Sequence, residues 1–152
     1  MKYTFITLIF LLFISCSNDN DNSQKDYREQ NEQEILDYLS VNNLNAEKSN
    51  SGLYYVIHEL GTGAQPTATS NVTVAYKGSL INGNVFDESD EAGISFNLQS
   101  VIPGWTEGIT YFKEDGNGIL LIPAHLGYGG NSVGTIPSGS VLIFDIELIS
   151  VN

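Results

Sequence analysis

The chain has 152 residues, enough for one domain of ordinary size, and a formal net charge of -12 at pH 7. This acidity argues against binding to nucleic acid, which needs a basic surface, and against electrostatic adhesion to anionic lipid. Because Cys16 is the only cysteine, an intramolecular disulfide is excluded and packing must stabilise the fold.

The N-terminal segment is typical of a secretory signal peptide. Lys2 is followed by an apolar run from Phe5 to Ile14, which is too short for a spanning helix of about 20 apolar residues. The run ends in "FISC", which resembles the lipobox of bacterial lipoproteins. We expect residues 1–15 to be a lipoprotein signal peptide and Cys16 to carry the lipid. The alternative is a plain signal peptide with an incidental cysteine.

A polar tether follows the cysteine. The stretch "SNDNDNSQKD" lacks large apolar side chains and cannot bury enough surface to offset the entropy of ordering, so residues 16–27 are expected to be flexible. From the lipobox we expect the protein to be located in the bacterial cell envelope, anchored by its lipid to the periplasmic or surface face of the outer membrane.

The next segment predicts a helix over residues 28–40. Ile35, Leu36 and Leu39 have helical spacing, acidic residues near the start suit the helix dipole, and Asn42 with Asn43 ends the segment. Such a helix could dock on the following domain or mediate pairing.

From Ser51 onward the pattern is that of strands, separated by glycine-rich turns. The strands are expected at residues 53–60, 71–81, 85–87, 94–98, 118–123 and 140–151. The last of these is the longest apolar run, so we expect it to be central. Residues 101–111 are too short and too glycine-bounded for a strand and suit a helix of two or three turns, with Pro103 in its first turn.

The long loop over residues 124–139 favours a functional role, since loops of this length in compact domains are uncommon. Metal and cofactor motifs are not evident: His58 and His125 are isolated, and no phosphate-binding loop is present. The remaining feature is a set of aromatic residues placed beside turns, which form either a binding pocket or plain core: Tyr76, Phe86, Phe96, Trp105, Tyr128 and Phe144. Composition alone favours core.

Four ordered motifs carry a resemblance: "VAYKGSLINGNVFDES", "FNLQSVIPGWTEG", "LLIPAHLGYG" and "IPSGSVLIFDIELI". In this order, between Ser51 and Asn152, they resemble the FKBP-type peptidyl-prolyl isomerases. With the preceding helix and the lipobox, the chain resembles FKBP lipoproteins of Bacteroidetes-type bacteria. The segment "IPAH" departs from the usual double proline, which bears on substrate preference more than on the fold.

The resemblance implies an α+β fold, in which a bent antiparallel sheet wraps around one short helix. It divides the chain further into an N-terminal helix and linker, residues 28–50, and an isomerase domain, residues 51–152. The implied catalytic residues are Tyr76, Phe86, Asp87, Trp105 and Tyr128. The implied substrate-binding residues are Phe96, Val101, Ile102, Ile136 and Phe144.

The implied function is catalysis of cis–trans rotation about X–Pro bonds, which assists the folding of envelope proteins without cofactor or metal. The expected partners are proline-containing polypeptides and macrolide inhibitors of the FKBP class. The membrane is contacted only through the lipid, and no nucleic acid is bound. The alternative function is a non-catalytic binding module that uses the same pocket.

Overall fold

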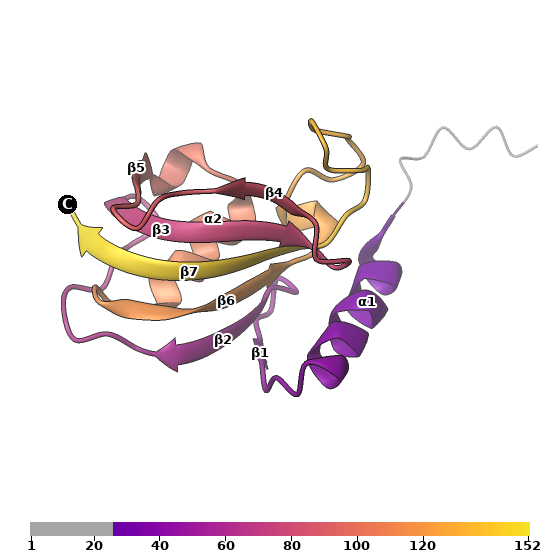
Figure 1. Cartoon of the computed structure of the whole chain (residues 1–152), viewed down its shortest axis with the longest axis horizontal. Coiled ribbons are helices and arrows are strands. Elements are labelled where there is room, and N and C mark those ends of the chain that lie inside the picture. The colour runs from indigo at the N-terminus through magenta and orange to yellow at the C-terminus, as the bar shows by residue number, and fades with distance from the viewer. Residues whose placement is uncertain (1–25) are drawn as a thin grey trace, which may run out of the picture.

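The computed structural model describes residues 26–152, which form one antiparallel sheet, with a short helix behind it and a longer N-terminal helix at one end (Figure 1). The expected signal peptide, Cys16 and residues 16–25 of the expected tether lie outside the described residues. Within residues 26–152, no helix has both the length and the apolar character needed to cross a membrane.

The order of the sheet is β1-β2-β6-β7-β3-β4, and β5 pairs with β3. The helices are α1 (Arg28–Val41) and α2 (Pro103–Gly108), with single 3-10 turns at Leu98–Ser100, Ile109–Tyr111 and Ala124–Leu126. The strands are β1 (Glu47–Lys48), β2 (Tyr54–Glu59), β3 (Asn71–Leu80), β4 (Val85–Glu88), β5 (Ile94–Asn97), β6 (Gly116–Ile122) and β7 (Leu142–Val151).

Strand β7 occupies the centre of the sheet, as its long apolar run predicts. It pairs with β6 on one side and with β3 on the other. Successive side chains of a strand point to opposite faces, so a central strand with both faces covered must be apolar at both. Accordingly, Ile143 joins the core on one face, and Leu142 and Phe144 join the core on the other.

Helix α2 packs on one face of the sheet at close range because it carries two glycines. A Cβ on Gly104 would lie 2.5 Å from Cγ2 of Ile122, and one on Gly108 would lie 2.7 Å from Cδ1 of Leu120. A larger residue at either position would overlap these side chains, so either they or α2 would have to shift. The larger core cluster fills this interface, with Trp105 and Phe112 among its buried members.

Helix α1 docks on the opposite face of the sheet, which confirms the first of its two expected roles. Ile35 and Leu39 are buried against side chains of β2, β6 and β7, and together they form a second core cluster. The described helix ends at Val41 and is followed by Asn42, within one residue of the expected end. The short strand β1 was not expected, because two charged residues give no apolar pattern.

Candidate active site

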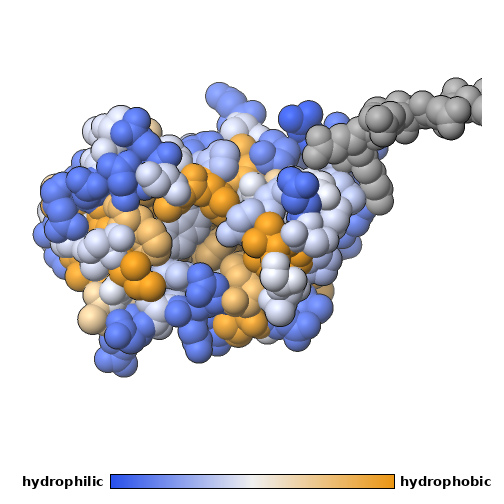
Figure 2. Space-filling model, turned by 90° about the horizontal axis from the view of Figure 1, so that it is seen from above, coloured by the Kyte–Doolittle hydropathy of each residue, from blue (hydrophilic) through white to orange (hydrophobic). Residues whose placement is uncertain are grey.

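A cavity of about 400 Å³ lies between α2 and the sheet. We name it the aromatic pocket; its lining residues are Tyr76, Asp87, Phe96, Ser100, Val101, Ile102, Trp105, Tyr128 and Phe144. Ligand sites of small molecules commonly have volumes of about 300–1,000 Å³ and a mainly apolar lining with few polar groups. Figure 2 shows apolar surface gathered around a hollow in the middle of one face, with polar surface around it.

Trp105 occupies the centre of the ring cluster and is only 4% exposed. Its ring meets those of Tyr76, Phe96 and Phe144 edge to face, with centroids 5.1, 5.4 and 5.2 Å apart. Such geometry is the favoured one for aromatic pairs. The indole Nε1 is buried and has no hydrogen-bond partner among the described residues. The start of α2 therefore presents a rigid, apolar surface to the pocket.

One polar edge of the pocket is formed by Tyr76 and Asp87. The Tyr76 hydroxyl donates a hydrogen bond to Oδ2 of Asp87 at 2.8 Å. Burial, together with this bond to a carboxylate, raises the pKa of Tyr76 to about 12. The hydroxyl therefore remains a proton donor at neutral pH, and it holds the Asp87 carboxylate at the edge of the pocket.

The second polar group is the backbone at the beginning of α2. Ile102 is the N-cap residue, and its carbonyl accepts hydrogen bonds from the N–H groups of Trp105 and Thr106. The first N–H groups of a helix have no intrahelical acceptor. Pro103 has no N–H at all, so the N–H of Ile102 is the first donor that the helix start offers beside the pocket.

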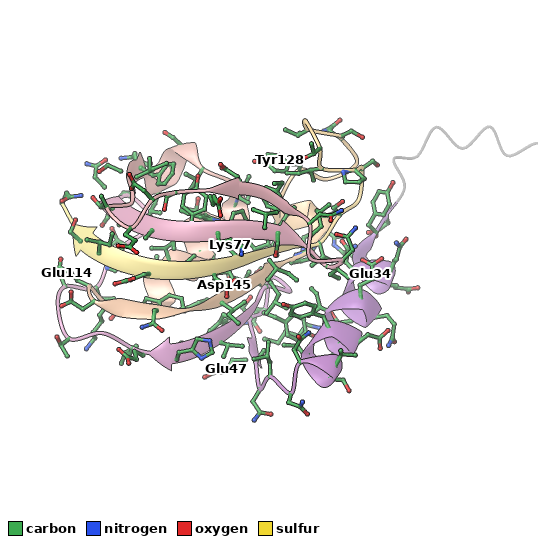
Figure 3. All side chains as sticks on the ribbon, in the orientation of Figure 1. Glu34, Glu47, Lys77, Glu114, Tyr128 and Asp145 are labelled. Carbon is green, nitrogen blue, oxygen red and sulfur yellow. The ribbon has the colours of Figure 1, made fainter. Side chains whose placement is uncertain are left out.

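Tyr128 reaches the pocket from the long loop between β6 and β7 (Figure 3), which we name the Tyr128 loop, residues 123–141. No hydrogen bond among the described residues involves the Tyr128 hydroxyl, so it is available to a bound molecule. Near its tip the loop contains a small hairpin, in which Val133 bridges to Ile136.

Eight of the ten expected site residues line the aromatic pocket, and Phe86 and Ile136 do not. Phe86 packs behind Phe144 at a ring distance of 5.5 Å and lies over Gly78, where a Cβ would be 2.6 Å from its Cε2. Ile136 is buried in the same core cluster. Both support the wall of the pocket.

Ser100 lines the pocket but was not among the expected residues. It ends the 3-10 turn that joins β5 to α2, next to Val101. Its place directly before the "VIPGW" stretch is the sequence signal that could have identified it.

The two histidines lie outside the aromatic pocket. Nε2 of His125 is 2.8 Å from the carbonyl oxygen of Ser51, and His58 lies by a shallow hollow elsewhere on the sheet. In the part of the chain that the structure describes, no group of three His, Cys, Asp or Glu side chains could hold a metal ion.

In the comparison with protein families, the family model of the FKBP-type peptidyl-prolyl cis-trans isomerases matches residues 62–149. This range holds all the lining residues of the aromatic pocket and most of the sheet. It excludes α1, β1 and β2.

Comparison with individual proteins identifies relatives from the same family. The chain is 50% identical over 107 residues to the FKBP-type peptidyl-prolyl cis-trans isomerase FkpA of Buchnera aphidicola from Schizaphis graminum, covering 68% of this chain and 42% of that protein. The chain thus spans less than half the length of this curated relative.

Among solved structures, FkpA from Escherichia coli superposes with a TM-score of 0.73 at 40% identity, over 82% of this chain and 61% of that one. A peptidyl-prolyl cis-trans isomerase from Pseudomonas syringae superposes with a TM-score of 0.71 at 29% identity, over 84% of this chain and 98% of that one.

Proposed function

Because this chain belongs to the FKBP-type peptidyl-prolyl cis-trans isomerase family, we propose that it catalyses cis–trans rotation about X–Pro bonds in polypeptides. The observation that carries the proposal is the aromatic pocket, an open cavity of about 400 Å³ lined mainly by aromatic and aliphatic side chains. Two separate polar groups, the Ile102 N–H and the Tyr128 hydroxyl, flank it.

The chemistry requires no bond to be broken. Amide resonance keeps the X–Pro bond planar, and the barrier to rotation is about 18–20 kcal/mol. The planar amide is strongly polar, and the twisted amide, which has lost resonance, is less so. An apolar pocket therefore disfavours the planar state relative to the twisted state. Each tenfold acceleration needs about 1.4 kcal/mol of such differential stabilisation.

The named residues divide this task. The rings of Trp105, Phe96 and Phe144 remove the reacting amide from water. The Ile102 N–H and the Tyr128 hydroxyl hold the carbonyl groups on either side of the proline, so that the peptide is bound in a turn. Asp87, held by the Tyr76 hydroxyl, keeps the edge of the pocket polar and orients the peptide there.

The second candidate function is a non-catalytic binding module that uses the same pocket. It is favoured by the segment "IPAH" near the start of the Tyr128 loop. Here Ala124 and His125 follow a single proline, where the family usually has two prolines in succession.

Titration with a macrolide of the FKBP-inhibitor class separates the two functions. Trp105 is the only tryptophan, so a fluorescence change on binding reports the aromatic pocket directly. Binding that also blocks catalysed exchange in a proline tetrapeptide supports the isomerase, since both molecules then occupy one site. Binding to a chain that shows no exchange supports the module. A folded chain with neither property would mean that the aromatic residues are plain core.

We further propose that the protein acts in the bacterial cell envelope, attached through lipid on Cys16, and assists the folding of proteins there. The support is the apolar run followed by "FISC" and a polar stretch. Clients of such an enzyme are exported polypeptides whose X–Pro bonds isomerise in roughly 10–100 s when uncatalysed, slowly enough to delay folding.

A further inference from the structure

Asn31 is the one fully buried polar side chain among the described residues, and it lies outside the range of the family match. It belongs to α1, on the opposite face of the sheet from α2. A buried side-chain amide is costly unless its donors and acceptor are paired. Its partners therefore indicate why an asparagine is placed here.

Asn31 joins the two ends of the Tyr128 loop. Its Oδ1 accepts a hydrogen bond from the N–H of Ala124 at 2.8 Å, and its Nδ2 donates to the carbonyl oxygen of Gly139 at 2.9 Å. The second N–H of the amide donates to Glu34 at 3.0 Å. The backbone partners fix the orientation of the amide, because an N–H must face its oxygen and a C=O must face its nitrogen.

The same two residues, Ala124 and Gly139, also form hydrogen bonds with the backbone on either side of Tyr128. The carbonyl of Ala124 accepts the N–H groups of Gly127 and Gly129, the two neighbours of Tyr128, at 2.9 and 2.7 Å. The N–H of Gly139 donates to the carbonyl of Gly129 at 2.9 Å. Asn31 thus completes a closed ring of hydrogen bonds that passes through the backbone next to Tyr128.

The start of α1 reinforces this connection. The ring of Tyr27 lies against Gly139, where any Cβ would overlap it, and Gly139 has a φ of +75°, which favours glycine. The Tyr27 and Ser138 hydroxyls are 2.9 Å apart and share a hydrogen bond. In Figure 3, Glu34 of α1 and Tyr128 of the loop lie at the same end of the sheet.

We propose that Asn31 is a positioning residue for the isomerase reaction, which holds the Tyr128 loop so that the Tyr128 hydroxyl reaches the bound peptide. The inference rests on the proposed function. It gives Asn31 an indirect role in the reaction, through the backbone of the loop, although no residue of α1 lines the aromatic pocket.

The test compares three variants of the full chain: Asn31→Ala, Asn31→Asp and, as a matched control, Ile35→Ala. Ile35 is buried on the same helix but packs in the second core cluster. Two quantities are measured: kcat/KM for a proline tetrapeptide, and amide hydrogen exchange at Gly129 and Gly139, whose N–H groups belong to the ring.

We expect Asn31→Ala to lower kcat/KM by about tenfold, since two buried hydrogen bonds to the loop are lost. Exchange at Gly129 and Gly139 should accelerate by a similar factor. Ile35→Ala should lower stability while leaving both quantities close to those of the wild type under conditions where it is folded.

Asn31→Asp adds a pH profile that a merely structural role would not produce. An ionised carboxyl cannot donate to Gly139, whereas a protonated one can both donate to Gly139 and accept from Ala124. Several charged or titratable groups face the ring of hydrogen bonds. Glu34 accepts from Asn31, and the Tyr27 ring lies against Gly139. Asp26, Arg28 and His125 line a hollow together with Ala124 and Gly129. Activity of this variant, relative to the wild type at the same pH, should recover as the pH falls and the new carboxyl is protonated.

Unchanged kcat/KM and unchanged exchange at Gly129 and Gly139 in Asn31→Ala would overturn the proposal, as would the absence of recovery in Asn31→Asp. A wild-type chain without isomerase activity would instead contradict the proposed function. In that case the amide exchange alone decides whether Asn31 holds the loop, so the two failures are distinguishable.

Discussion

Tyr128 is the pocket residue whose placement the sequence defines least. A loop of glycines and short polar residues has no apolar period that fixes its path. The resemblance of the "GYG" stretch to the family was needed to expect Tyr128 beside Trp105. The structure brings it to the aromatic pocket through hydrogen bonds from Gly127 and Gly129 that no sequence pattern specifies.

Tyr128→Phe should reduce kcat/KM or ligand affinity while leaving the melting temperature nearly unchanged. A neutral hydrogen bond contributes about 0.5–1.5 kcal/mol, which corresponds to roughly a two- to twelvefold loss. Peptide isomerisation kinetics and thermal unfolding of the same samples check this. A large fall in melting temperature with intact activity would show that the side chain is structural.

Tyr76 gives a prediction about alkaline stability. Its folded-state pKa of about 12 exceeds the ordinary value of 10. The stabilisation linked to this shift is therefore complete below pH 10 and is lost as the pH rises from about 10 to 12. Tyr76→Phe should reduce the loss of stability in this window. Part of the loss will remain, because the pKa of Tyr111 is also raised to about 12, by burial and its bond to Glu107.

Urea unfolding of the wild type and the Tyr76→Phe variant between pH 9 and 12 is the measurement. If the free energy of unfolding falls equally with pH in the wild type and in Tyr76→Phe, the assignment of the raised pKa to Tyr76 is wrong.

At the scale of elements, the sequence predicted α1, α2 and all the longer strands, because each has a clear apolar period or a cluster of turn residues at its ends. The central place of β7 also followed from its apolar run. What the sequence did not provide is the face on which α1 docks. The same apolar stripe, Ile35 to Leu39, would suit another copy of the chain as well as β6 and β7.

The close contact of α2 with β6 predicts coupled mutations. Gly108→Ala should destabilise the chain by about 1–3 kcal/mol through overpacking against Leu120, partly offset by the better helix propensity of alanine. Leu120→Ala alone should cost about 2–5 kcal/mol. In the double variant the new methyl group has space, so the loss should be smaller than the sum of the two.

A double-mutant cycle from urea unfolding measures this difference, and residues in contact typically couple by about 0.5–3 kcal/mol. Strict additivity of the two losses would mean that α2 is not held against β6 at Gly108.

At the scale of the whole molecule, the resemblance predicts an isomerase domain of residues 51–152 that is preceded by a helix and linker, residues 28–50. In the structure α1 packs on the sheet, and β1 of the expected linker pairs with β2. Eight of the ten expected site residues, which come from all four sequence motifs, meet in the aromatic pocket. This convergence could be expected only through the resemblance, since spacing alone does not bring Tyr76, Trp105 and Tyr128 together.

The proposed anchor gives a prediction for the complete chain. Because one residue would carry the lipid, Cys16→Ser should release the protein from membranes while its fold is kept. Detergent-phase partitioning of both proteins, expressed in a bacterium that processes lipoproteins, checks this, and circular dichroism confirms folding. If both partition alike, the lipoprotein proposal is wrong.

The central claim is that the protein catalyses X–Pro rotation in the aromatic pocket. Its most direct test is exchange NMR of a proline tetrapeptide in the presence of a much lower concentration of the full-length protein. Uncatalysed exchange takes roughly 10–100 s at 25 °C, so the peptide alone gives no exchange cross-peaks between its cis and trans forms within a second. We predict that such cross-peaks emerge with the protein and vanish when a macrolide fills the aromatic pocket. Exchange that stays at the uncatalysed rate, in a folded chain that binds the peptide, would contradict the account.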